Sequence, residues 1–182
     1  NYYRKPPTMT FAKKRLLSLL LGCGLALPSL AADLAVEVEI PRLNVAEYHR
    51  PYVAVWVERA DNSIAAHLAV LYDAKMKYGE GTKWLKDLRQ WWRRGGRDLA
   101  MPVDGITGAT PTVGKQKLRF AQGKAPLGDL PPGDYKLGIE AAREVGGREL
   151  LYIPFQWPPR QAQQARAQGQ SELGHITLDL KP

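Results

Sequence analysis

The strongest constraint on the fold is an alternation of apolar and polar side chains that recurs along the chain. The segment LAVEVEI, residues 34–40, places Val36, Val38 and Ile40 on one side and two glutamates on the other. Because successive side chains of a β-strand point to opposite faces, this period predicts a strand with one buried face. The same pattern recurs in PPGDYKLGIEA, residues 131–141, and in HITLDL, residues 175–180.

Other segments read as strands joined by short turns. YVAVWVE and IAAHLAVLY, residues 52–58 and 64–72, flank the turn-forming Asp61-Asn62-Ser63 and predict a hairpin of more fully buried strands. GRELLYIPF follows the strand of residues 131–141 across a Gly146-Gly147 turn. Since strands do not alternate regularly with helices, we predict a mainly β fold, an antiparallel β-sandwich of immunoglobulin-like or similar type with one inserted amphipathic helix.

The inserted helix is predicted over residues 82–94, in TKWLKDLRQWWRRGG. Trp84, Leu88 and Trp91 recur at helical spacing, Thr82 can serve as N-cap, and Gly95 ends the segment. Leu85 and Trp92 widen the apolar stripe. The indoles of this helix can be interpreted in two ways, as anchors of a core or as a wall for a planar ligand.

The chain has room for one domain, which we place at residues 33–182. Within it, residues 102–114 form a loop rich in small and hydroxyl-bearing residues. Residues 158–172, rich in Gln and Ala without an apolar period, are expected to form a polar surface loop before the last strand.

The N-terminal part has the pattern of an export signal. Residues 1–8 precede the first methionine and are interpreted as a non-native or upstream extension. Residues 9–32 combine a basic start, an apolar run at 16–27 and small residues around Ala31, as a secretory signal peptide does. We therefore expect a periplasmic protein. An uncleaved anchor and a lipoprotein modified at Cys23 are the alternatives.

Cleavage after Ala31 or Ala32 would change composition and charge. It would remove Cys23, the only cysteine, so that any redox role would need a cofactor. It would leave 21 basic and 18 acidic residues, a net charge of +3 instead of +8. A basic cluster remains, interpreted as a solvated face or a docking patch for an acidic partner or the membrane surface and not as a nucleic-acid site; it comprises Lys83, Lys86, Arg89, Arg93, Arg94 and Arg97.

The three histidines give little support for hydrolytic or metal chemistry. His49, His67 and His175 are scattered, and no His-x-x-x-His or Gly-x-Ser-x-Gly pattern accompanies them. We therefore expect no catalytic residue and no metal site.

The stretch VDGITGATPT, residues 103–112, raises a different possibility. Pro111 disfavours helical backbone at Thr110, so the Thr110 hydroxyl can project, and Gly108 and Ala109 leave room for a second macromolecule. The stretch DGITGAT resembles the flavinylation motif of bacterial flavin-carrying domains, such as subunits of sodium-pumping and related membrane redox complexes. In those families an exported, metal-dependent FAD:protein FMN transferase attaches FMN to the last threonine as a phosphodiester.

Carried onto this chain, the resemblance implies FMN on Thr110. Transferase recognition would then involve Asp104, Gly105, Thr107, Gly108 and Ala109. Thr107 stands where many members have Ser, and Thr112 is interpreted as an ordinary loop residue. A threonine hydroxyl is a weak nucleophile that needs a base and a metal-polarised phosphate, and the transferase would supply both.

Across most of residues 33–182 the chain is also similar to the predicted periplasmic proteins of domain-of-unknown-function family 2271. This resemblance implies companions in electron transfer, namely the flavin transferase and a membrane-bound reductase as electron donor or acceptor. We therefore expect a flavoprotein electron carrier, a non-catalytic substrate of the transferase. An apolar bed for the flavin ring could come from Trp84, Trp91, Trp92, Tyr152 or Trp157. The alternative is a non-redox binding or interaction module.

Overall fold

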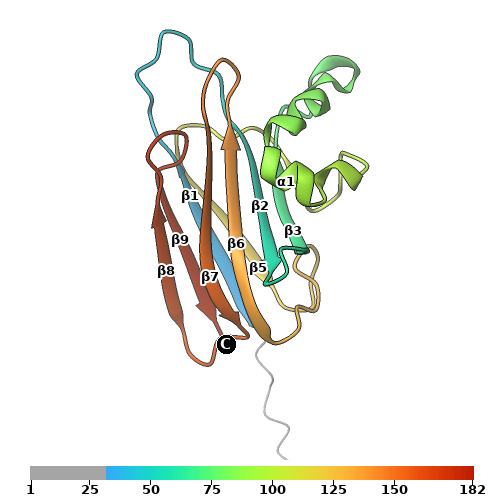
Figure 1. Cartoon of the computed structure of the whole chain (residues 1–182), viewed down its shortest axis with the longest axis vertical. Coiled ribbons are helices and arrows are strands. Elements are labelled where there is room, and N and C mark those ends of the chain that lie inside the picture. Colours follow the sequence, from blue (N-terminus) through green and yellow to red (C-terminus); the bar gives the residue numbers. More distant parts are fainter. Residues whose placement is uncertain (1–31) are drawn as a thin grey trace, which may run out of the picture.

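The computed structural model describes residues 32–182, which form two facing β-sheets (Figure 1). The four-stranded sheet has the order β5-β1-β9-β8, and the five-stranded sheet has the order β4-β3-β2-β6-β7. All strand pairs are antiparallel except the short β3–β4 pair. The predicted mainly β sandwich is confirmed. The strand bounds are β1 Asp33–Ile40, β2 Tyr52–Arg59, β3 Ile64–Leu71, β4 Thr107–Gly108, β5 Gly114–Ala121, β6 Gly133–Ala142, β7 Arg148–Trp157, β8 Gln163–Gln168 and β9 His175–Lys181.

The predicted N-terminal extension, 1–8, and signal peptide, 9–32, lie outside the described residues except for Ala32. No helix in the described part of the chain is long and apolar enough to cross a membrane.

The main core lies between the two sheets and follows the alternation read from the sequence. Every second residue of β1, from Leu34 to Ile40, is buried, and the intervening glutamates are only partly buried. The inward side chains of β9, in the same sheet, and of β6, in the facing sheet, pack with the buried residues of β1 in one core. Burial of these branched side chains, at about 1.5–3 kcal/mol each, is what holds the sheets together.

A second, smaller core covers the outer face of the five-stranded sheet. Trp56 and Val70 point away from the main core and pack with Leu88 and Trp91 from the helical segment. Strand β2 is therefore buried on both faces, which explains why its sequence is a continuous apolar run and not an alternation. Gly138 on β6 makes room for the Trp56 indole, since a Cβ there would lie 2.4 Å from it.

The predicted α-helix over 82–94 is wrong in its start and in its type. A 3₁₀ segment, η1 (Lys77–Asp87), comes first, Leu88 interrupts it, and a short α1 (Arg89–Arg94) follows, with η2 (Gly96–Asp98) after it. Thr82 lies inside η1, where its hydroxyl donates to the carbonyl of Gly79 at 2.7 Å, so it is not the N-cap.

This change of helix type moves the buried stripe. The fully buried apolar residues are Leu85 in η1, Leu88 at the break and Trp91 in α1, so the buried stripe crosses the change of helix type. Trp84, which the α-helical spacing placed on that stripe, is 42 % exposed instead. The buried carboxylate of Glu140 on β6 fixes where α1 begins, because it accepts the backbone N–H groups of Gln90 and Trp91 at 2.8–3.0 Å.

Two predicted loops contain strands. Residues 158–172 include β8, which pairs with β9 at the edge of the four-stranded sheet and has no fully buried residue. The loop 102–114 includes β4, two residues long. Strand β5 was not predicted, although its exposed Lys115, Lys117 and Arg119 alternate with half-buried residues, as an edge strand requires.

Candidate functional site

The site begins with a tight turn at residues 103–107. The Thr107 hydroxyl accepts the backbone N–H of Val103 at 2.8 Å, and the Thr107 N–H donates to the Val103 carbonyl at 2.9 Å. Asp104 and Gly105 lie at the exposed tip, and Gly105 has a φ of +73°, which favours glycine. Thr107 therefore closes the turn with its own hydroxyl.

The next residues attach this turn to the edge of the five-stranded sheet. Strand β4 runs parallel to β3, with Val70 N–H donating to the Ile106 carbonyl and Tyr72 N–H to the Gly108 carbonyl, both at 2.9 Å. A Cβ on Gly108 would lie 2.6 Å from Leu71 Cδ2, so any larger residue there would displace that side chain. The small residue at 108 thus lets the loop lie flat against β3.

Thr110 emerges from β4 between two hollows. The first, which we call the Trp84 pocket, has a volume of about 360 Å³. It is lined by His49, Arg50, Tyr52, Asp73, Met76, Trp84, Asp87, Thr110, Ala142, Arg143 and Glu144. A second hollow of about 390 Å³, the Lys75 pocket, lies on the other side and is lined by Arg50, Tyr72, Asp73, Ala74, Lys75, Thr107, Gly108, Ala109 and Thr110. Arg50, Asp73 and Thr110 belong to both. Both volumes fall in the range of about 300–1,000 Å³ that small-molecule sites occupy.

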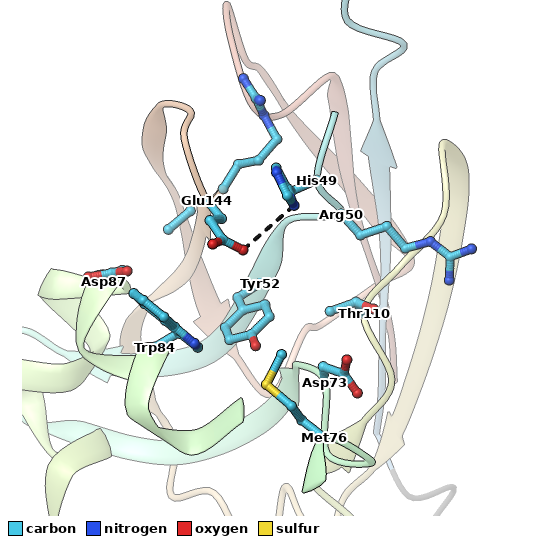
Figure 2. A pocket seen from close by; sticks show the side chains of 11 residues that line it. His49, Arg50, Tyr52, Asp73, Met76, Trp84, Asp87, Thr110 and Glu144 are labelled. Atoms are coloured by element: carbon cyan, nitrogen blue, oxygen red, sulfur yellow. Dashed lines mark ion pairs between the residues drawn. The ribbon is translucent and has the colours of Figure 1, made fainter. Parts of the chain in front are cut away.

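Figure 2 shows how the Trp84 pocket is arranged. Thr110 and Arg50 lie at one side of it, Trp84 lies at the opposite side, and Tyr52 occupies the space between them in this view. These side chains come from three chain segments that meet at one end of the sandwich, with Arg50 and Tyr52 together at the start of β2.

Among the aromatic residues predicted to bed a planar ligand, only Trp84 lines the pocket that Thr110 borders. Trp91 on α1 is fully buried, with its indole N–H donating to His67 at 3.0 Å, and Trp157 lies in the main core. Trp92 and Tyr152 pack against the second core. Of the two readings of the indoles, the core reading holds for Trp91 and Trp157.

The pocket rim carries charges of both signs. His49 lies between the carboxylates of Glu47, at 2.9 Å, and Glu144, at 3.6 Å, the second contact being the dashed line in Figure 2. In contrast, the exposed Arg50 makes no hydrogen bond or ion pair with residues 32–182. Burial raises the pKa of the Tyr52 hydroxyl, which therefore stays neutral at the pocket floor.

Other sequence-predicted features lie away from this pocket. His67 lies on β3 under α1, and His175 begins β9. The six basic residues of the predicted cluster, from Lys83 to Arg97, are all exposed. Thr112 is exposed, and its carbonyl accepts the Gln116 amide. No cluster of three or more His, Cys, Asp or Glu side chains within residues 32–182 is arranged to hold a metal.

Sequence reasoning did not find four of the residues around Thr110, namely Arg50, Tyr52, Asp73 and Glu144. Arg50 and Glu144 flank strands, Tyr52 begins β2, and Asp73 follows β3. Their local sequence carries no motif, and the only signal is that antiparallel pairing brings these strand ends together. That signal becomes readable once the strand order is known.

Among curated proteins and among solved structures, none matches this chain. A family model does match it, over residues 33–175, and that range contains both sheets except for most of β9. The chain therefore belongs to the family described as predicted periplasmic protein (DUF2271).

Proposed function

We propose that this protein carries FMN linked through a phosphodiester to Thr110 and serves as an electron carrier outside the cytoplasm. The observation that carries the proposal is that the seven residues DGITGAT form one ordered loop ending at the pocket lip. The turn, the close approach to β3 and the half-buried acceptor Thr110 follow in the order in which the motif resemblance assigns recognition and attachment.

The residues present fit such a group. Thr110 is half-buried and borders a pocket with an exposed indole and a thioether, Trp84 and Met76, which suit a planar aromatic ring. Arg50, which has no ion partner in residues 32–182, lies beside Thr110 in both hollows, where a phosphodiester would stand.

The attachment chemistry would be supplied by the transferase. The Thr110 Oγ1–phosphorus bond forms while the pyrophosphate bond of FAD breaks; AMP leaves, and the hydroxyl proton passes to a base on the transferase. Nothing in this chain needs to act as that base, and the residues around Thr110 accordingly need only present the hydroxyl. A covalent flavin would give electron-transfer capacity to a mature chain without a thiol.

The membership in a family described as predicted periplasmic supports the location. An exported transferase would meet the protein there, and a membrane-bound reductase would be the electron donor or acceptor. The export step itself rests on residues 9–32.

Co-expression with an exported FAD:protein FMN transferase, followed by intact-mass analysis, tests the proposal. We expect the mass of one FMN, less water, on the wild-type chain and on Thr112→Ala, and none on Thr110→Ala. Thr110→Ser, which keeps a hydroxyl, serves as the matched control and should retain part of the modification. A wild-type chain that never gains this mass contradicts the proposal and favours a non-redox binding module. A gain that survives Thr110→Ala also contradicts the proposal, because FMN would then be attached at another residue.

A further inference from the structure

The exposed apolar side chains of the described residues gather in the segments at one end of the sandwich. The seven are Val45, Tyr48, Met76, Tyr78, Trp84, Val113 and Val145. They belong to the β1–β2 loop, the segment between β3 and α1, the link from β4 to β5, and the β6–β7 turn. Strand pairing brings all four segments to the same end, since Tyr52 of β2 pairs with Ala142 and Ile40 of β1 pairs with Gly114 (Figure 1).

Single exposed apolar side chains are ordinary on a soluble domain, so the informative feature is that two of the seven, Trp84 and Met76, line one pocket. At this end, the Trp84 pocket borders Thr110 and contains an indole. Trp84 is 42 % exposed and Met76 is 37 % exposed, and both line it. The two side chains are thus held by the fold without being covered by it.

The geometry around Trp84 explains why its indole is left there. Leu85, its neighbour in η1, is buried against the sheet, so the 3₁₀ segment is anchored and cannot turn Trp84 inward without exposing Leu85. Between Trp84 and Thr110, the phenol of Tyr52 is held in an edge-to-face contact with Tyr72, with ring centroids 6.2 Å apart. The pocket is therefore formed before any ligand arrives.

Resting on the proposed function, we infer that the Trp84 pocket is the bed of the Thr110-linked flavin, with the isoalloxazine ring packed on Trp84 and the phosphodiester beside Arg50. The tether starts at Thr110, at the side of the pocket that Arg50 shares, and the ring reaches across Tyr52 toward Trp84 (Figure 2). Arginine suits this position because its guanidinium can donate two parallel hydrogen bonds to phosphate oxygens.

In this arrangement the linkage and the flavin ring are each held by different residues, whereas a flavin on a mobile tether would be held only at Thr110. Arg50 neutralises the linkage, and Trp84 with Met76 shields one face of the ring from water. The ring is then held in one orientation in the asymmetric environment of the protein and does not rotate freely in solvent. Its fluorescence and its visible circular dichroism report that setting directly.

The experiment uses the flavinylated full chain, with one flavin per chain verified by intact mass. Wild type, Trp84→Ala and Trp84→Phe are compared by flavin fluorescence per flavin and by circular dichroism in the flavin bands. Tyr78→Ala is the matched control, since Tyr78 lies at the kink near the start of η1, is 98 % exposed and does not line the pocket. Because Trp84 is largely outside the core, far-ultraviolet circular dichroism should show these variants folded.

We expect quenched fluorescence and a visible dichroic signal in wild type and in Tyr78→Ala. Loss of one aromatic stacking contact should shift the balance between packed and free ring roughly 2- to 10-fold in Trp84→Ala, with Trp84→Phe in between. Arg50→Gln should weaken the packed state as well, and Arg160→Gln, the same charge change at the opposite end of the sandwich, should not.

The outcomes separate this inference from the proposed function. If wild type gains the flavin mass but its flavin fluoresces as free FMN does, with no dichroic signal, the pocket assignment is wrong and the attachment stands. Equal signals in wild type and Trp84→Ala likewise overturn the assignment. If wild type gains no mass, both fall together.

Discussion

Thr107 shows how a motif residue can be explained by local structure alone. Its hydroxyl accepts the Val103 N–H at 2.8 Å and closes the turn that precedes β4. Thr107→Val keeps the shape and removes the acceptor, so we expect a loss of about 0.5–1.5 kcal/mol in the free energy of unfolding. Urea unfolding measures it, and hydrogen exchange at the Val103 amide should become faster.

Two controls accompany that change. Thr107→Ser keeps the hydroxyl and should retain the slow exchange at Val103, and Thr112→Val, at an exposed threonine whose hydroxyl makes no hydrogen bond with residues 32–182, should leave both measurements unchanged. Unaltered exchange in Thr107→Val would show that the turn does not depend on this hydroxyl.

A single histidine under α1 should make stability depend on pH. Burial lowers the pKa of His67, whose Nδ1 accepts the Trp91 indole N–H at 3.0 Å. The unfolded chain then binds a proton at a higher pH than the folded chain does. The stabilisation is complete above the unfolded pKa, near 6.5, and is lost as the pH falls through the lower folded pKa.

Urea unfolding between pH 7.5 and pH 5 measures this dependence. Wild type should lose stability as the pH falls, and His67→Gln, which keeps a neutral acceptor for the indole, should show a flatter profile. Identical slopes in the two proteins would mean that another group titrates in this range.

At the scale of elements, the helical segment depends on one buried carboxylate. Glu140 is fully buried on β6, accepts the backbone N–H groups of Gln90 and Trp91, and pairs with Arg148. Glu140→Gln removes the charge and puts an amide N–H where an acceptor is needed. We expect a loss of about 1.5–3 kcal/mol, since hydrogen bonds to charged groups contribute about that much.

The matched control is Glu80→Gln, which breaks the exposed pair with Lys83 in the neighbouring 3₁₀ segment. Such surface pairs contribute less than about 1 kcal/mol. Thermal unfolding of both variants decides the matter, and equal losses would show that Glu140 does not anchor α1.

The elements that could be predicted are those whose side chains alternate strongly. Strands β1 and β9 have buried branched residues at every second position, and the sequence pattern shows this directly. In β6, the buried Tyr135, Leu137, Ile139 and Ala141 recur at the same spacing. The helical segment could not be typed, because Trp84 and Leu85 are both apolar and a spacing of three or four fits equally well. Tertiary contact with Glu140, which the local sequence does not reveal, fixes where α1 begins. Edge strand β8 escaped prediction because little of it is buried.

The candidate site could be predicted only in part, for a reason that belongs to the whole molecule. The acceptor loop is local, so Thr110 and its motif could be identified from a short stretch of sequence. The pocket beside it joins Arg50, Trp84 and Glu144, which are far apart in the chain and meet only through the pairing of β2 with β3 and β6. No local pattern carries that information.

The same whole-molecule view predicts what the last strand does. The family-model match ends at residue 175, yet β9, His175–Lys181, lies inside the four-stranded sheet and pairs with β1 on one side and β8 on the other. Ile176, Leu178 and Leu180 are buried between the sheets. A chain ending at Gly174 would lose these side chains, at about 1.5–3 kcal/mol each, and would leave β1 and β8 without their shared partner.

That loss is comparable with the total stability of an ordinary domain, about 5–15 kcal/mol, so we expect the shortened chain not to unfold cooperatively. Thermal unfolding followed by circular dichroism measures this, with a chain lacking only Pro182 as control. Retention of a cooperative transition by the shortened chain would mean that residues 32–174 fold without β9. Such a result would make the five-stranded sheet, with Thr110 and the Trp84 pocket at its end, a unit that does not need the other sheet to be complete.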